Sequence, residues 1–154
     1  MAQIKILEGR LPWIMKKLYL DIDGVLLTSK QTKPAGNVVQ FINFVTSNFD
    51  CYWLTTHCKG SKKTALNYLE KHFDDKTLYK METIKPTNWT ALKTEGIDFT
   101  SDFFWLEDFP FQSEINILEN KKLKERLITV DLNRPDELLR IIAFLEKSIS
   151  SSAE

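Results

Sequence analysis

The sequence predicts an α/β fold with a mostly parallel sheet and helices on both faces. Two observations predict it. Short apolar runs alternate along the chain with amphipathic segments of helical period, which indicates strands alternating with helices. Polar or acidic residues directly follow several of the apolar runs. Ligands of such sheets bind beyond the carboxyl ends of the strands, so these residues are the first candidates for a functional site.

Five apolar runs are the expected strands. The first leads into an acidic segment, and the second is a short apolar run typical of a buried parallel strand. The third is weak, and the fourth, which reads Phe-Phe-Trp-Leu, is short and strong. In chain order the expected strands are residues 18–20, 50–56, 78–84, 103–106 and 127–130.

The first two helices are predicted by the spacing of their apolar residues. Between Val38 and Val45, apolar side chains recur every three or four residues, which places them on one face of a helix over 36–48. A second helix is expected to open after Gly60, with Ser61 as its N-cap.

The second half of the chain predicts a long loop and two more helices. Residues 85–102 are loop-rich, and 113–126 are amphipathic and helical. Pro135 suits the first position of a last helix, with Asp136 and Glu137 in the first turn, where acidic side chains are favourable.

Length and composition predict one soluble globular domain, which we place at residues 15–147. The Ser-rich residues 148–154 are expected to form a flexible tail. Residues 1–14 lack the apolar block of a signal peptide, and the sequence does not decide whether they are an upstream extension, a cloning artefact or an extra edge element.

Charge and hydropathy narrow the expected partners and compartment. The formal net charge is zero, which does not indicate a nucleic-acid partner, and no apolar run approaches the ~20 residues of a membrane span. Cys51 and Cys58 could pair on count alone, but reduced thiols in a cytoplasmic protein are the preferred interpretation. The sequence does not indicate an oligomeric state.

The most informative segment is the acidic one after the first strand. Asp21 and Asp23 are two residues apart and can converge on one face of an extended segment, and Gly24 then lets the backbone turn away. One carboxylate can attack an electrophile while the other moves protons, and both can help to hold a divalent cation. A polar turn is the alternative. A calcium loop does not fit, because apolar residues follow Gly24 at once.

This segment resembles motif I of the haloacid dehalogenase (HAD) superfamily, Asp-x-Asp-Gly after a hydrophobic strand. The resemblance implies a Rossmann-like three-layer sandwich with a mostly parallel, five-stranded sheet. It also implies a phosphatase in which Asp21 forms an aspartyl-phosphate. Asp23 would then serve as the general acid and base, and Mg²⁺ would be held by Asp21 and by the backbone carbonyl of Asp23.

Two further strand ends match motifs of that family. Thr55 follows the second strand, as the motif II hydroxyl does, with Thr56 as the alternative register. Glu107 and Asp108 follow the fourth strand, as the acid pair that completes the magnesium site does; the first acid is Glu rather than the commoner Asp. Taken alone, Asp108 would also suit a helix N-cap.

The resemblance also requires a lysine in the cleft, because phosphate and carboxylate charges repel without a fixed cation. Lys93 and Lys85 are the candidates, and we favour Lys93. It lies 107 − 93 = 14 residues before the acid pair, a short spacing similar to that of the capless branch of the family.

The spacing of the motifs predicts a site without a cap domain. Asp21 and Thr55 are 55 − 21 = 34 residues apart, and Thr55 and Lys93 are 93 − 55 = 38 apart; each gap is already filled by expected elements. The resemblance then implies an open cleft and a bulky phosphorylated substrate, which leaves a phosphorylated nucleic acid open as a substrate. A regulatory module of weak activity that binds metal or phosphate, and a phosphotransferase, remain as alternative functions.

Overall fold

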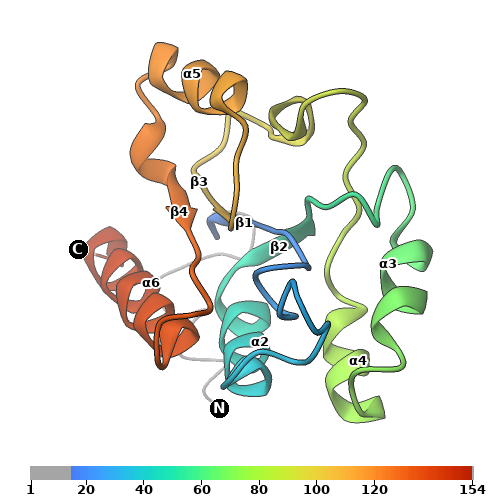
Figure 1. The fold of residues 1–154 in the computed structure, drawn as a ribbon. Helices are drawn as coiled ribbons and strands as arrows, with labels where there is room; N and C mark the ends of the chain where they lie inside the picture. Colours follow the sequence, from blue (N-terminus) through green and yellow to red (C-terminus); the bar gives the residue numbers. More distant parts are fainter. Residues whose placement is uncertain (1–14, 154) are drawn as a thin grey trace.

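The structure, a computed structural model, describes residues 15–153, with the side chains of 15–150. It is α/β and contains a four-stranded sheet in the order β2-β1-β3-β4, with every pair parallel (Figure 1). The strands are β1 (Lys17–Leu20), β2 (Asp50–Trp53), β3 (Phe103–Glu107) and β4 (Leu127–Thr129). The expected α/β class is therefore confirmed, and the arrangement is compatible with a Rossmann-like fold.

Helices of the described part of the chain alternate with these strands (Figure 1). They are α2 (Val38–Asn48), α3 (Lys62–Leu69), α4 (Asp75–Met81), α5 (Gln112–Asn120) and α6 (Glu137–Ala153), with short 3₁₀ turns η2 (Lys93–Gly96) and η3 (Lys124–Arg126). None of the helices in residues 15–153 is long and apolar enough to cross a membrane.

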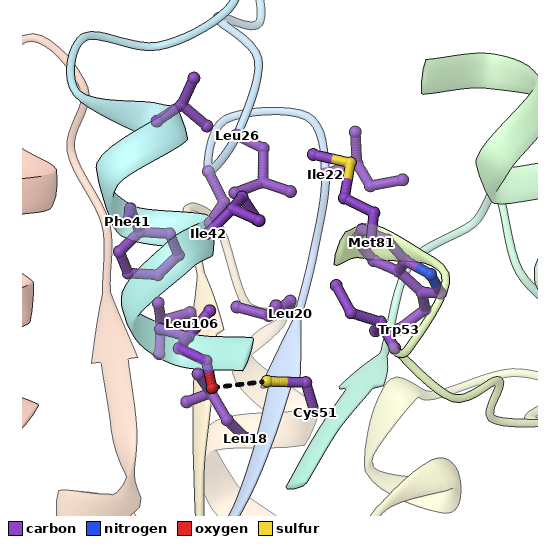
Figure 2. Packing of buried hydrophobic residues seen from close by; sticks show 14 of the residues in the cluster. Leu18, Leu20, Ile22, Leu26, Phe41, Ile42, Cys51, Trp53, Met81 and Leu106 are labelled. Carbon is purple, nitrogen blue, oxygen red and sulfur yellow. Dashed lines mark hydrogen bonds between the residues drawn. The ribbon is translucent and has the colours of Figure 1, made fainter. Parts of the chain in front are cut away.

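The two faces of the sheet pack against different elements, because side chains alternate along each strand. On one face, Leu18 and Leu20 of β1 pack with buried residues of α2, α3, α4 and α6. Figure 2 shows part of this core, in which Leu20 lies among Leu106, Ile42 and Trp53. On the other face, Tyr19 of β1 packs with residues of β3, of α5 and of the segment before β3. The sheet is thus covered on both faces.

The expected face of α2 is the one that is buried, and the expected cap of α3 is present. Val38, Phe41, Ile42 and Val45 are all buried. The hydroxyl of Ser61 accepts a hydrogen bond from Lys63 N at 3.2 Å.

Both cysteines are free and buried. Cys51 lies 3.3 Å from the carbonyl of Val45 (Figure 2). Burial raises the pKa of both thiols, so both stay protonated at neutral pH.

The strand expected at 78–84 is wrong, because most of this segment belongs to α4. The carboxylate of Asp74 caps the helix by accepting from Thr77 N at 2.9 Å, and Leu78 and Met81, three residues apart, share the buried face. A single residue beyond the helix, Lys85, forms an isolated parallel bridge with Tyr52 at the edge of β2. The described residues therefore contain four strands rather than the expected five.

Several other element ends differ from expectation, and β2 is three residues shorter than the expected strand at 50–56. The predicted helix at 113–126 ends earlier, at Asn120 of α5. Helix α6 begins at Glu137, because Asp136 has a φ of 56°, so Pro135 lies in the preceding turn and is not the first helical residue. At its other end α6 continues to Ala153, through most of the expected tail, whose flexibility stays a prediction. The expectations for residues 1–14 lie outside the described residues.

Candidate functional site

The strand ends that carry the expected site residues meet at one edge of the sheet. Leu20 of β1 pairs in register with Trp53 of β2 and with Leu106 of β3. The next residue on each chain segment is therefore at the same level: Asp21, Leu54 and Glu107. This register explains why Asp21 and Glu107, 86 positions apart in sequence, lie at the same edge of the sheet.

Lys93 lies between two of the predicted acids. Its Nζ donates to Asp21 Oδ2 at 2.9 Å and to Glu107 Oε1 at 2.7 Å. All three side chains are largely shielded from solvent, with exposures of 13% for Lys93, 10% for Asp21 and 4% for Glu107. A shielded ion pair of this kind needs several partners to offset the loss of hydration, and each member of this group has more than one.

Neighbouring backbone groups fix the positions of these three side chains. Ile22 N donates to Asp21 Oδ1 at 2.8 Å, and Phe109 N donates to Glu107 Oε2 at 3.3 Å. Lys93 opens the turn η2, and its backbone N donates to the buried carboxylate of Glu114 at 2.7 Å. Glu114 also accepts from Phe111 N at 2.9 Å, so it ties the lysine segment to the start of α5.

Burial and neighbouring charges shift the pKa values of Glu107 and Lys93. Burial, the largest cause, and the charge of Asp21 together raise the pKa of Glu107 to about 8, although Lys93 opposes both. Burial alone would lower the pKa of Lys93, but Asp21 and Glu107 outweigh burial and raise it. The lysine therefore stays charged, and the site has more carboxylates than it has cations.

Asp108 adds a third carboxylate to this group. One oxygen each from Asp21, Glu107 and Asp108 lie within 4.8 Å of one another. Gly24 lies against Asp108, since a Cβ added to Gly24 would overlap the Asp108 carboxylate. Three carboxylate oxygens this close together form a hard donor set that suits Mg²⁺ or Ca²⁺.

Asp23 lies apart from these three acids. Its Oδ1 accepts from the hydroxyl of Tyr68 at 2.8 Å, and its Oδ2 lies 3.0 Å from Nε2 of His57. The rings of His57 and Tyr68 stack, with centroids 3.8 Å apart and planes 12° apart. Burial and the bond to Asp23 raise the pKa of Tyr68 to about 12, so the phenol keeps its proton.

Thr55 lies just beyond β2, and its side chain is fully buried. Its hydroxyl oxygen accepts from His57 N at 3.3 Å. Thr56, the alternative in the next register, is exposed. Leu54 N donates to Leu20 O at 2.8 Å, so this segment continues alongside β1 toward Asp21.

The other candidate lysine lies elsewhere. Lys85 Nζ pairs with Asp50 Oδ1 at 2.9 Å, and Asp50 is the first residue of β2, at the opposite end of the strand from Thr55. Of the two lysines, Lys93 is the one that the structure brings to Asp21 and Glu107.

A polar hollow of about 630 Å³ adjoins Asp108. Its walls come from the turn after β1 and from the loop between β4 and α6. Hydroxyl, amide and charged side chains dominate the lining, which includes Thr28, Ser29, Lys30, Thr129, Asn133 and Arg134.

The aromatic side chains near the cleft fall into two groups. Trp89 packs in the core on the α5 face of the sheet, with Lys59 Nζ 4.3 Å from its ring centroid, which is ordinary packing. Phe109 and Phe111, in the loop after β3, are 77% and 56% exposed. These two exposed rings follow the acid pair in the chain and are accessible to a bound molecule.

Two contributors to the site had no sequence prediction. Tyr68 directly precedes Leu69, a buried residue of α3, so the sequence suggests a core position for it. A tyrosine in such a position needs a hydrogen-bond partner for its hydroxyl. This need is the one sequence feature that could have indicated its contact with a polar site. Glu114 resembles an ordinary acid in the first turn of α5, and sequence alone does not reveal that it holds the backbone of Lys93.

Comparison with known proteins adds no family to this geometry. No protein-family model, curated protein or solved structure matches the chain.

Proposed function

We propose that the chain is a magnesium-dependent phosphohydrolase of the HAD type that acts through an aspartyl-phosphate on Asp21. The observation that carries this proposal is the group of Asp21, Lys93 and Glu107, with Asp108 beside it, at the carboxyl edge of a parallel sheet. Its members belong to three segments that resemble the family's motifs in sequence order. A purely structural role would not require two shielded carboxylates on one lysine with a third carboxylate beside them.

Asp21 is suited to nucleophilic attack on phosphorus. Ile22 N and Lys93 Nζ hold its two oxygens, which fixes the direction of the carboxylate. A bond forms from a carboxylate oxygen to phosphorus as the bond from phosphorus to the ester oxygen breaks, and Asp23 gives a proton to that leaving oxygen. Asp23 then takes a proton from water as the water oxygen attacks phosphorus and releases Asp21.

Lys93 and Thr55 are proposed to bind the phosphoryl oxygens. The lysine is fixed at both its backbone and its ammonium group, so it needs little reorganisation when charge develops. Thr55 lies at the end of the neighbouring strand, and its hydroxyl can donate to a phosphoryl oxygen while accepting from His57 N.

The donor set fits Mg²⁺, with Asp21, the acid pair and the Asp23 carbonyl as its proposed ligands. Within the acid pair, Glu107 is paired with the Lys93 ammonium and Asp108 is not, so we assign Asp108 as the acid of the pair that binds the ion directly. The ion would supply charge neutralisation for the phosphoryl group.

We further propose an open cleft that accepts a bulky phosphorylated substrate. The segments between the motifs support the absence of a cap, because their helices α2, α3 and α4 pack into the main core. The hollow beside Asp108 offers room for the leaving group, and Phe109 and Phe111 offer an apolar rim for a larger molecule.

A second candidate is a regulatory module of the same fold that binds metal or phosphate with little turnover. The observation that favours it is the tight pairing of Glu107 with Lys93, which leaves the acid pair with one freely available carboxylate. A phosphotransferase would share the aspartyl-phosphate but need an acceptor other than water.

A phosphate-release screen with and without Mg²⁺ tests the proposal. The panel contains phosphopeptides, oligonucleotides phosphorylated at the 3′ or 5′ end and small sugar phosphates, and the Lys85→Met variant serves as a control that should match the wild type. We expect release that needs Mg²⁺ and is lost in Lys93→Met. Absence of release from every ester would favour the binding module, and release that depends on an added alcohol acceptor would favour the phosphotransferase.

A further inference from the structure

We propose that His57 and Tyr68 are positioning residues for the general acid and base Asp23. This inference rests on the proposed function and extends it to two residues outside the motifs. The hydroxyl of Tyr68 donates to one oxygen of Asp23 at 2.8 Å, and Nε2 of His57 lies 3.0 Å from the other oxygen, to which it donates in the Nε2–H tautomer.

The need for positioning follows from the environment of Asp23. Its side chain is 44% exposed, unlike the shielded carboxylates of Asp21 and Glu107, so burial alone does not select one orientation. A general acid must lie within hydrogen-bond reach of the oxygen that it protonates, and a freely rotating carboxylate spends much of its time out of reach. Two donors on two different oxygens fix both side-chain torsions.

The two donors also fix each other. The imidazole of His57 stacks on the phenol of Tyr68 at a centroid distance of 3.8 Å, so neither ring can move without losing the contact. His57 follows the β2 segment that carries Thr55, and Tyr68 belongs to α3, so the stack connects the strand edge to a helix. Each carboxylate oxygen has two lone pairs, so a lone pair remains to carry the proton that Asp23 gives to the leaving oxygen and later takes from water.

His57 and Tyr68 could have one of two roles: they could stabilise the fold alone, or they could also orient Asp23 for catalysis. A core tyrosine or a hydrogen-bonded histidine would contribute to folding alone. A positioning pair instead changes the proton-transfer step, and that step matters most when the leaving group is a poor one. Stable leaving groups such as p-nitrophenolate depart without protonation, whereas alkoxides do not.

The test is a leaving-group series measured on variants of the two residues. Tyr68→Phe removes only the hydroxyl and keeps the ring. His57→Phe keeps a ring that can stack but removes the nitrogen that contacts Asp23. His57→Gln removes the ring but places an amide N–H donor at a similar distance from the backbone. His72→Phe is the matched control, because its ring contacts Tyr68 edge-on at 6.0 Å, farther away than His57. The substrates are p-nitrophenyl, phenyl and alkyl phosphates with Mg²⁺.

We expect kcat/KM for alkyl phosphates to fall about tenfold or more in Tyr68→Phe and His57→Phe, a part of the ~10²–10⁴-fold that general acid–base catalysis supplies. For p-nitrophenyl phosphate kcat/KM should change less than about threefold, because this ratio extends only to release of the leaving group and does not include the later attack of water, in which Asp23 acts on every ester alike. His57→Gln should recover part of the loss. His72→Phe should match the wild type.

An equal loss on every ester, or no loss, would overturn the inference while leaving the phosphohydrolase proposal intact. A wild-type protein that hydrolyses none of the esters would overturn both. Circular dichroism and thermal midpoints check folding; if His57→Phe does not fold, Tyr68→Phe decides alone, because it removes a single oxygen.

Discussion

Among single residues, Asp21 is held by a backbone donor on one oxygen and by Lys93 on the other. We predict that Asp21→Asn abolishes turnover and keeps the fold, because the amide is nearly isosteric but cannot attack phosphorus. The free energy of unfolding should change by less than about 2 kcal/mol, since the lost pairing with Lys93 is offset by weaker repulsion of Glu107.

Phosphate release and urea unfolding, measured on the same preparation, check this prediction. Full activity in a folded Asp21→Asn protein would contradict the nucleophile assignment. Loss of both activity and folding would show instead that the carboxylate is structural.

Gly24 lies in the turn after Asp23 and directly against Asp108. Its φ is 82°, a conformation that is unfavourable for residues with a Cβ, and its missing side chain leaves room for the Asp108 carboxylate. We predict that Gly24→Ala destabilises the protein by about 1–3 kcal/mol and displaces Asp108, which weakens Mg²⁺ binding.

Gly36→Ala is the matched control for this change, because a Cβ at Gly36 would contact nothing within 4 Å. Urea unfolding measures the stability, and isothermal titration with MgCl₂ measures the affinity. Equal behaviour of the two variants would show that the close approach of Gly24 to Asp108 has no energetic consequence.

At the scale of elements, Glu137 fixes the loop between β4 and α6. Its buried carboxylate accepts from Asp131 N at 2.9 Å and from Arg140 at 2.8 and 3.0 Å, which closes the turn that lines the hollow. The bond to Arg140 is the main cause that lowers the pKa of Glu137. We predict that Glu137→Gln costs about 1–3 kcal/mol at pH 7, as expected for loss of buried hydrogen bonds to a charged group.

The sign of the pH dependence follows from that lowered pKa. The ionised carboxylate stabilises the fold above its ordinary value of 4.5, and the stabilisation is lost as pH falls through the lower folded value. The difference between wild type and Glu137→Gln should therefore shrink as the pH is lowered from 5 toward 3. Glu146→Gln, an exposed acid on the same helix, should show no such difference in thermal midpoints.

The elements that were predicted correctly are those whose signal is local. The stripe from Val38 to Val45 and the cap at Ser61 depend on neighbouring residues, and both are present. The segment at 78–84 was mistaken for a strand because its short apolar pattern fits either period; the Asp74 cap decides for a helix. Pro135 fits a first helical position by composition, but the left-handed Asp136 moves the helix start to Glu137.

The sequence could predict which edge of the sheet carries the site, but not the contacts between its side chains. Adjacent parallel strand ends predicted that Asp21 and Glu107 face one edge, and the register has that arrangement. The contact of Lys93 with both acids depends on a loop of irregular structure, and the pairing of Asp23 with Tyr68 joins residues 45 positions apart. Long-range contacts of this kind leave no periodic signal in a single sequence.

For the whole molecule, the last prediction concerns access to the cleft. We propose a cleft without a lid, and such a cleft cannot exclude water by closing on a small ligand. The substrate's own surface, or a neighbouring subunit, must then cover the phosphate. We predict that phosphorylated oligonucleotides or phosphopeptides are hydrolysed with higher kcat/KM than small sugar phosphates. The exposed rings of Phe109 and Phe111 should contribute to binding the larger molecules.

Phe109→Ala and Phe111→Ala test this contribution. We expect each substitution to raise KM for the preferred polymer several-fold. This rise corresponds to a loss of about 1 kcal/mol of binding free energy, as expected for an apolar contact that is only partly buried in the complex. The KM for p-nitrophenyl phosphate should change little. Tyr79→Ala, which removes an equally exposed ring from α4, should change neither value. A sugar phosphate hydrolysed far faster than any polymer would contradict the open-cleft proposal, because the small ligand would then need a cover that the chain itself supplies.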